Sequence, residues 1–139
     1  MEGRQSKVIW VNGTFDILHP GHLALLEHAR NLGDTLIVGI DRDDRVRELK
    51  GPTRPVNSAD IRMINLKKLR LIDRVVTFNS DSELENWIKV FKPEIMVVGS
   101  DYIGKKIIGS EWANEVQYFE RVGDYSTTKI IQSINEKTS

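Results

Sequence analysis

Short apolar runs alternate with amphipathic stretches along this chain. Residues 8–11, 35–40 and 95–98 are continuously apolar, a pattern typical of strands buried on both faces of a sheet. Two further strands are predicted at 74–78 and, with a more exposed alternating pattern, at 115–119. Helices are predicted around 23–32, 58–71, 82–91 and 126–134. The charged segment 41–56 contains glycine and prolines and is predicted to be a loop.

This order of strands and helices predicts the fold class. Strands that alternate with helices imply right-handed crossovers and a parallel sheet. We therefore expect an α/β fold, with a Rossmann-like doubly wound, five-stranded parallel sheet and helices on both faces. Such sheets bind ligands beyond the carboxyl ends of their strands. The loops of interest follow Val11, Ile40, Phe78, Val98 and Phe119.

Length and charge limit the possible classes of protein. The chain has 139 residues, enough for a single core, so we expect one domain over 1–139 with flexible ends at 1–6 and 135–139. It is 40% hydrophobic and 29% charged, the balance of a globular protein. Its 20 acidic and 20 basic residues cancel, whereas nucleic-acid binders usually carry a basic excess. No nucleic-acid partner is expected.

The chain contains no cysteine, which excludes disulfides and thiolate metal sites and fits a reducing compartment. Residues 1–7 are polar and lack the apolar stretch of a signal peptide. No apolar run approaches the ~18 residues that cross a bilayer. We expect a cytoplasmic protein that does not interact with membranes.

The loop after the first strand carries the strongest candidate site. His19 and His22 lie three residues apart where a helix is predicted to begin, with Gly21 between them. Unpaired N–H groups at a helix start favour phosphate oxygens, and imidazoles beside them add donors. Alternatively, His19 caps the helix and His22 packs on the sheet. Two histidines could also share a metal ion, but no further ligand is suitably placed, so we expect no metal bound by protein side chains.

Two other segments could bind anions. Ser126, Thr127 and Thr128, followed by Lys129, begin the last predicted helix, where they could cap the helix or bind a phosphate group. Arg121 could add a charged fork there. In the predicted loop 41–56, Lys50 and Arg54 are either solvated or reach an anionic substrate.

Residues 13–22 and 126–130 together resemble the HxGH and STT motifs of the cytidylyltransferase-like nucleotidyltransferases. The resemblance covers about residues 7–134. It implies an enzyme in which the HxGH histidines contact the triphosphate and stabilise the transition state. The catalytic residues so implied are His19, His22, Lys50 and Arg62.

The same resemblance implies the substrate contacts. The implied nucleotide-binding residues are Thr14, Phe15, His19, His22, Asp101, Arg121, Ser126, Thr127 and Thr128. The implied acceptor-binding residues are Asp16, Lys50 and Arg54. The reaction would join an acceptor phosphate to the α-phosphorus of a nucleoside triphosphate and release pyrophosphate. Mg²⁺ would accompany the nucleotide, and the family resemblance suggests a homodimer.

Two branches of this family compete. Residues 49–51, 54–57, 62–63, 101–102 and 109 resemble the adenylyltransferase domain of ADP-heptose synthase. That branch implies ATP, a phosphorylated sugar such as heptose 1-phosphate, and a role in lipopolysaccharide or cell-envelope synthesis. Arg121 and Lys129 instead match glycerol-3-phosphate cytidylyltransferase, which makes CDP-glycerol from CTP. The chain departs from the first branch at Ser100, where a glycine is usual, and lacks the second branch's lysine near Asn79. We favour ATP over CTP.

Two hypotheses from other classes of protein remain. A nucleotide-sensing module with a dead site conflicts with the intact His19, His22, Lys50 and Arg62. A class I aminoacyl-tRNA synthetase fragment would share an HxGH-type motif. The short length, the neutral charge and the lack of a tRNA-binding extension argue against it.

Overall fold

The computed structural model describes residues 6–120 of the chain. Its strands are β1 (Val8–Gly13), β2 (Thr35–Asp41), β3 (Arg74–Phe78), β4 (Ile95–Gly99) and β5 (Glu115–Phe119). Its helices are α1 (Pro20–Arg30), α2 (Asp43–Lys50), α3 (Ala59–Lys68) and α4 (Asp81–Phe91), with short 3₁₀ turns η1 (Ser100–Tyr102) and η2 (Ser110–Trp112). All the predicted strands up to residue 119 are confirmed.

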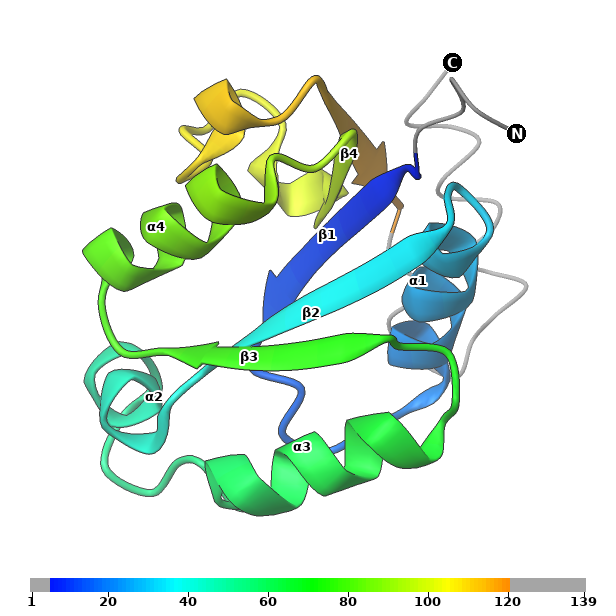
Figure 1. The fold of residues 1–139 in the computed structure, drawn as a ribbon. Coiled ribbons are helices and arrows are strands. Elements are labelled where there is room, and N and C mark those ends of the chain that lie inside the picture. The colour runs from blue at the N-terminus through cyan, green and yellow to red at the C-terminus, as the bar shows by residue number, and fades with distance from the viewer. Residues whose placement is uncertain (1–5, 121–139) are drawn as a thin grey trace.

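The strands form one parallel sheet in the order β3-β2-β1-β4-β5 (Figure 1). The chain therefore reverses its direction of travel across the sheet between β1 and β4, which makes this the topological switch point. Gly13 pairs with Ile40, so β1 and β2 end almost level with each other. The loops after these two strands consequently emerge side by side.

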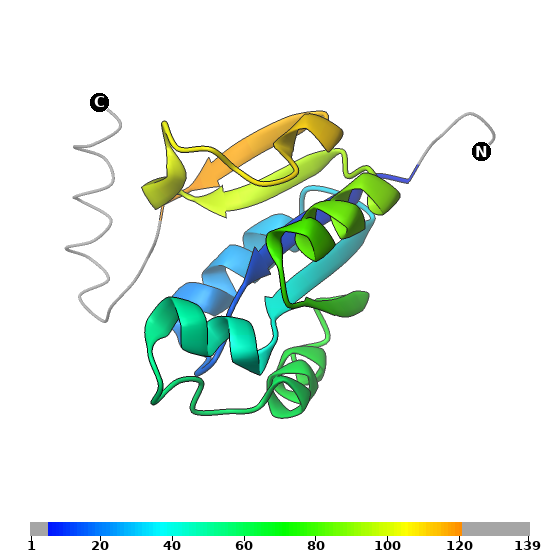
Figure 2. The same ribbon diagram turned by 90° about the vertical axis from the view of Figure 1, so that its left-hand side faces the viewer.

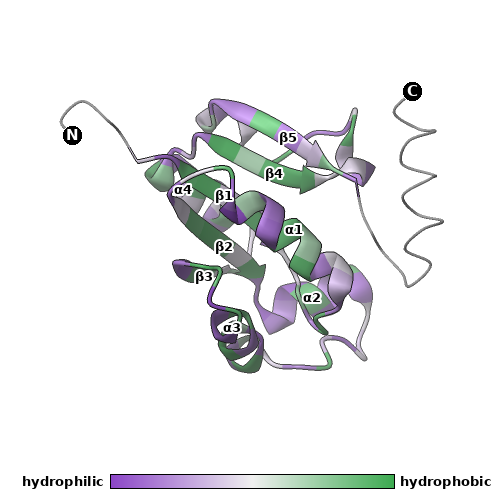
Figure 3. Ribbon diagram, turned by 90° about the vertical axis from the view of Figure 1, so that its right-hand side faces the viewer, coloured by the Kyte–Doolittle hydropathy of each residue, from purple (hydrophilic) through white to green (hydrophobic). Residues whose placement is uncertain are grey.

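Two apolar layers enclose the sheet. On one face, Leu26 and Ala29 of α1 and Leu66 of α3 pack on the strands. On the other, Leu84 and Ile88 of α4 form a second cluster, which also takes in apolar side chains of the segment between η1 and η2. Figure 2 shows α4 in front of the sheet, and Figure 3 shows α1 in front of the opposite face. The predicted doubly wound α/β fold is confirmed.

The predicted loop 41–56 contains a helix, α2, so the prediction was wrong over 43–50. Val46 is the only buried residue of this helix, so no apolar period marks it in the sequence. Ion pairs at helical spacing accompany it, between Asp41 and Arg45 and between Asp44 and Arg47. The helix ends at Lys50 and its C-cap is Gly51, whose φ of 107° suits glycine.

None of the helices within residues 6–120 is long and apolar enough to cross a membrane.

Candidate active site

The loop after β1 turns sharply at Phe15, which has a positive φ of 51°. The Phe15 ring is buried, and its centroid lies 5.1 Å from that of the His22 ring. The left-handed backbone is uncommon for a bulky residue, so the buried ring has to hold this turn in place. The turn brings the chain from the end of β1 to the first residues of α1.

His19 is the N-cap of α1. Its Nδ1 accepts a hydrogen bond of 3.1 Å from the Gly21 backbone, and the backbone N–H of His19 in turn donates to Nδ1 of His22 at 3.3 Å. The two rings stack with their centroids 3.8 Å apart. The alternative that His19 caps the helix is therefore confirmed, and the reciprocal bonds form a capping box.

These bonds also set the chemistry of both rings. A backbone N–H can only donate, so Nδ1 of His19 and Nδ1 of His22 must each accept. A neutral imidazole then carries its proton on Nε2. Each ring thus has an Nε2–H donor while its Nδ1 serves the helix start. Capping and phosphate binding are compatible here, because they use different nitrogens.

Both histidines line a cavity of about 230 Å³ at the switch point of the sheet. Its walls come from the β1–α1 loop, from α1 and from the carboxyl ends of β4 and β5. The lining residues are Asn12, Gly13, Thr14, Phe15, His19, Gly21, His22, Leu25, Gly99 and Phe119. The structure therefore brings together the sequence-predicted Thr14, Phe15, His19 and His22.

A second cavity, of about 340 Å³, adjoins the first. The two share Asn12, Gly13 and Thr14 as a common wall. Lys50 lines the second cavity and not the first. The predicted phosphate-binding histidines and the predicted acceptor lysine thus lie in different cavities that meet at the end of β1.

The second cavity also contains an ion pair that the sequence analysis missed. Arg45 Nε donates to Asp41 Oδ1 at 2.8 Å, and its NH2 group donates to Asp81 Oδ1 at 2.7 Å. Burial acts to lower the pKa of the Arg45 guanidinium, but the bonds to Asp81 and Asp41 outweigh it and raise that pKa above its ordinary value. The Thr14 hydroxyl donates to the other oxygen of Asp41 at 3.3 Å. Asp41 directly follows Ile40, where the second predicted strand ends. Because ligands bind beyond the carboxyl ends of such strands, Asp41 could have been predicted as a site residue.

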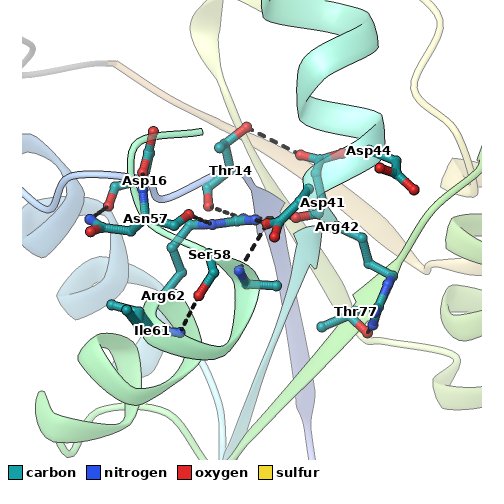
Figure 4. Close-up of polar contacts among 12 residues, drawn as sticks. Thr14, Asp16, Asp41, Arg42, Asp44, Asn57, Ser58, Ile61, Arg62 and Thr77 are labelled. Atoms are coloured by element: carbon teal, nitrogen blue, oxygen red, sulfur yellow. Dashed lines mark hydrogen bonds and ion pairs between the residues drawn. The ribbon is translucent and has the colours of Figure 1, made fainter. Parts of the chain in front are cut away.

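Arg62 is enclosed by the protein. Its side chain is fully buried and lines neither cavity, so its catalytic role stays a prediction. Its guanidinium donates to protein acceptors 2.7–3.0 Å away, namely Thr14 O, Asp41 O, Asn57 O and Asp43 Oδ1. Figure 4 shows the Arg62 side chain among Thr14, Asp41 and Asn57. Arg62 positions the loops around both cavities.

Asp16 also holds a loop. Its two carboxylate oxygens accept the backbone N–H groups of Val56 and Asn57 at 2.7 and 2.8 Å. The Asn57 side chain donates back to the Asp16 carbonyl at 2.8 Å (Figure 4). Asp16 lines neither cavity, and its predicted contact with the acceptor stays a prediction.

The remaining predicted residues fall into two groups. Arg54 and Asp101 are exposed and line neither cavity, although Gly99 and Tyr102 near Asp101 do line them. The predictions for Arg121, Ser126, Thr127 and Thr128 fall outside the described residues. Across 6–120, no group of three or more His, Asp or Glu side chains is arranged to hold a metal ion.

The fold is a doubly wound α/β domain with two cavities at the carboxyl ends of its strands, and the family comparison specifies the class. The model of the cytidylyltransferase-like family matches residues 10–136. The chain therefore belongs to the cytidylyltransferase-like family and is a nucleotidyltransferase.

Curated relatives are similar over nearly the whole chain. It is 47% identical over 131 residues to the bifunctional protein HldE of Helicobacter hepaticus, an alignment that covers 94% of this chain. It is 48% identical over 128 residues to the protein of the same name from Sulfurimonas denitrificans, covering 92% of this chain. The chain spans only 27% of the length of each of these relatives.

A solved structure shares the fold. A lipopolysaccharide core biosynthesis protein from Thermoplasma volcanium superposes with a TM-score of 0.69 and 24% identity. The match covers 84% of this chain and 98% of the other. At that identity the likeness supports the fold alone.

Proposed function

We propose that this nucleotidyltransferase transfers AMP from ATP to the phosphate of a phosphorylated sugar such as a heptose 1-phosphate, with release of pyrophosphate. The similarity to the HldE proteins supports this choice of substrates and a role in lipopolysaccharide synthesis. Its cytoplasmic location is part of the same proposal, because nucleoside triphosphates are available there.

The shared wall between the two cavities is the observation that carries the proposal. A transfer between two phosphate groups requires two substrates whose reacting ends meet. The nucleotide would occupy the cavity lined by His19 and His22, and the acceptor the cavity lined by Lys50. Their phosphates would then meet beside Thr14, which lines both cavities.

The reaction is an in-line substitution at phosphorus. An oxygen of the acceptor phosphate attacks the α-phosphorus of ATP, the bond to the β-phosphate oxygen breaks, and pyrophosphate leaves with that electron pair. Both reactants are anions, so catalysis consists mainly of positioning and charge stabilisation. The Nε2–H groups of His19 and His22 would donate to the α-phosphate oxygens as negative charge builds on them. No covalent intermediate with the protein is needed.

Magnesium fits this scheme as part of the nucleotide substrate. Mg²⁺ keeps several waters and binds readily to phosphate oxygens. Asp41 is the carboxylate in the cavity linings, and Arg45 already neutralises it. We therefore propose that the triphosphate itself holds the ion. Ser126, Thr127, Thr128 and Arg121 stay predicted phosphate contacts.

Direct competition tests the base and the acceptor. With equal ATP and CTP, first with heptose 1-phosphate and then with glycerol 3-phosphate, we expect the ADP-sugar to be the main product by mass spectrometry. CDP-glycerol as the main product would overturn the choice of base and acceptor. Pyrophosphate release that no acceptor stimulates above the level with ATP alone would contradict the proposed transfer.

Replacing Lys50 tests the assignment of the second cavity. A hydrogen bond from a cation to an anion is worth about 1.5–3 kcal/mol, so Lys50→Ala should lower kcat/KM for the acceptor by roughly 10-fold or more. The KM for ATP should stay within about twofold. Arg47→Ala is the matched control, because Arg47 lies on the same helix and lines neither cavity. Equal acceptor kinetics in the two variants would remove Lys50 from the site.

A further inference from the structure

The second cavity carries more positive charge than its own carboxylate neutralises. Among residues 6–120, Arg45, Lys50 and Lys106 line it together with a single carboxylate, that of Asp41. The described part of its lining therefore has a surplus of two positive charges. Lys106 belongs to no motif that the sequence analysis singled out.

That surplus resides on the two lysines. Arg45 is already bonded to Asp41 and Asp81, so its charge is matched within the protein. Within residues 6–120, no hydrogen bond or ion pair engages the ammonium group of Lys50 or of Lys106. Both ammonium groups are therefore available to a ligand.

Two separate parts of the chain bring these lysines to the cavity. Lys50 is the last residue of α2, and Lys106 lies between η1 and η2. The segment that carries Lys106 is anchored on both sides. Lys105 N donates to Tyr102 O at 2.9 Å, and the side chains of Ile107 and Ile108 pack on the second apolar cluster. The backbone at Lys106 is thus held at the cavity, while its long side chain can reach inward.

We propose that Lys106 binds the phosphate of the acceptor together with Lys50. Two like charges in one cavity repel each other unless an anion lies between them. A phosphate monoester carries close to two negative charges near neutral pH, which matches the surplus of the lining. This inference rests on the proposed function and defines the acceptor's reactive group as a phosphate monoester. Lys106 then acts as a substrate-binding residue on the side of the cavity away from α2.

The test compares two adjacent lysines. Lys106→Gln keeps most of the side-chain length and removes the charge. Lys105→Gln is the matched control, because Lys105 is exposed and lines neither cavity. At saturating ATP, Lys106→Gln should raise the KM for heptose 1-phosphate about tenfold, as expected for a lost charged hydrogen bond. The control should stay within about twofold, and Lys106→Arg should recover most of the loss because the charge is restored.

An unchanged acceptor KM in an active Lys106→Gln variant would overturn the inference and leave the proposed function intact. A rise in the KM for ATP without a rise for the acceptor would also overturn it. If the wild-type chain transfers nothing to any acceptor, the proposed function fails, and inorganic phosphate titrated by calorimetry becomes the readout for Lys106. Lys106→Gln should then bind phosphate at least about threefold more weakly than Lys105→Gln. Equal affinities would refute the anion site.

Discussion

His19→Asn is expected to fold as stably as the wild-type chain and to lose about 100-fold or more in kcat. Asparagine is a good N-cap, so the start of α1 keeps its side-chain acceptor. It lacks the Nε2–H donor that the ring of His19 would direct at the α-phosphate. Losing one donor used chiefly in the transition state typically costs ~3 kcal/mol, which sets the size of the effect. Steady-state kinetics and urea unfolding measure the two quantities separately.

Companion variants separate capping from catalysis. His19→Ala should lose the same activity and also about 1 kcal/mol of stability, because alanine cannot cap the helix. His22→Ala should likewise lower kcat about 100-fold, with a smaller change in the KM for ATP. His28→Ala is the matched control, since His28 lies on the same helix and lines neither cavity. A His19→Asn or His22→Ala variant that kept more than half of the wild-type kcat would rule out the role assigned to that residue.

Arg62→Met is expected to destabilise the folded chain by about 3–5 kcal/mol in the absence of nucleotide. The substitution would leave the buried carbonyl of Asp41, the part-buried carbonyl of Thr14 and the carboxylate of Asp43 without the guanidinium that they share. Unpaired groups of this kind carry most of the cost when a buried ion pair is broken. Urea unfolding of the free protein measures this loss.

Two further variants keep the Arg62 test decisive. Lys68→Ala, on an exposed position of the same helix, should change stability by less than about 0.5 kcal/mol. Arg62→Lys retains the charge but cannot reach all the separate acceptors that the guanidinium spans, so its stability should be intermediate. A loss below about 1 kcal/mol in Arg62→Met would contradict the positioning role.

The strands could be predicted from the sequence because buried strands are recognisable from a few consecutive apolar residues. Strands covered on both faces have to be continuously apolar, and the runs at 8–11, 35–40 and 95–98 are. Helix α2 gave no such signal, because Val46 is its single buried residue and the ion pairs around it join residues of ordinary surface type. Periodicity detects a helix by its buried face, and this helix has almost none.

In the candidate site, too, local features could be predicted from the sequence and long-range contacts could not. The capping of α1 by His19 could be predicted because its partner and the start of the helix lie within two residues of it. The catalytic roles of His19 and His22 stay predictions. The burial of Arg62 could not be predicted, because it depends on acceptors in α2 and in the β1–α1 loop that are 19 and 48 residues away along the chain. Arginine is rarely buried, and a sequence does not display the carbonyl groups that make it possible here. Lys106 could not be predicted either, because its place at the second cavity depends on how the chain folds back after β4.

The common wall at Asn12, Gly13 and Thr14 has a consequence for how such an enzyme can diverge. A substitution in this tripeptide alters both cavities together, so it would change the handling of both ligands at once. The outer linings are separate: Leu25 and Phe119 face only the first cavity, and Tyr102 and Lys106 only the second. Exchanges at these outer positions could retune the choice of one ligand while the other is handled as before. With the two cavities assigned to nucleotide and acceptor as we propose, the shared tripeptide would serve the reaction itself, and the outer positions would each select one substrate. The outer positions are then the ones to randomise when new nucleotide–sugar pairings are sought.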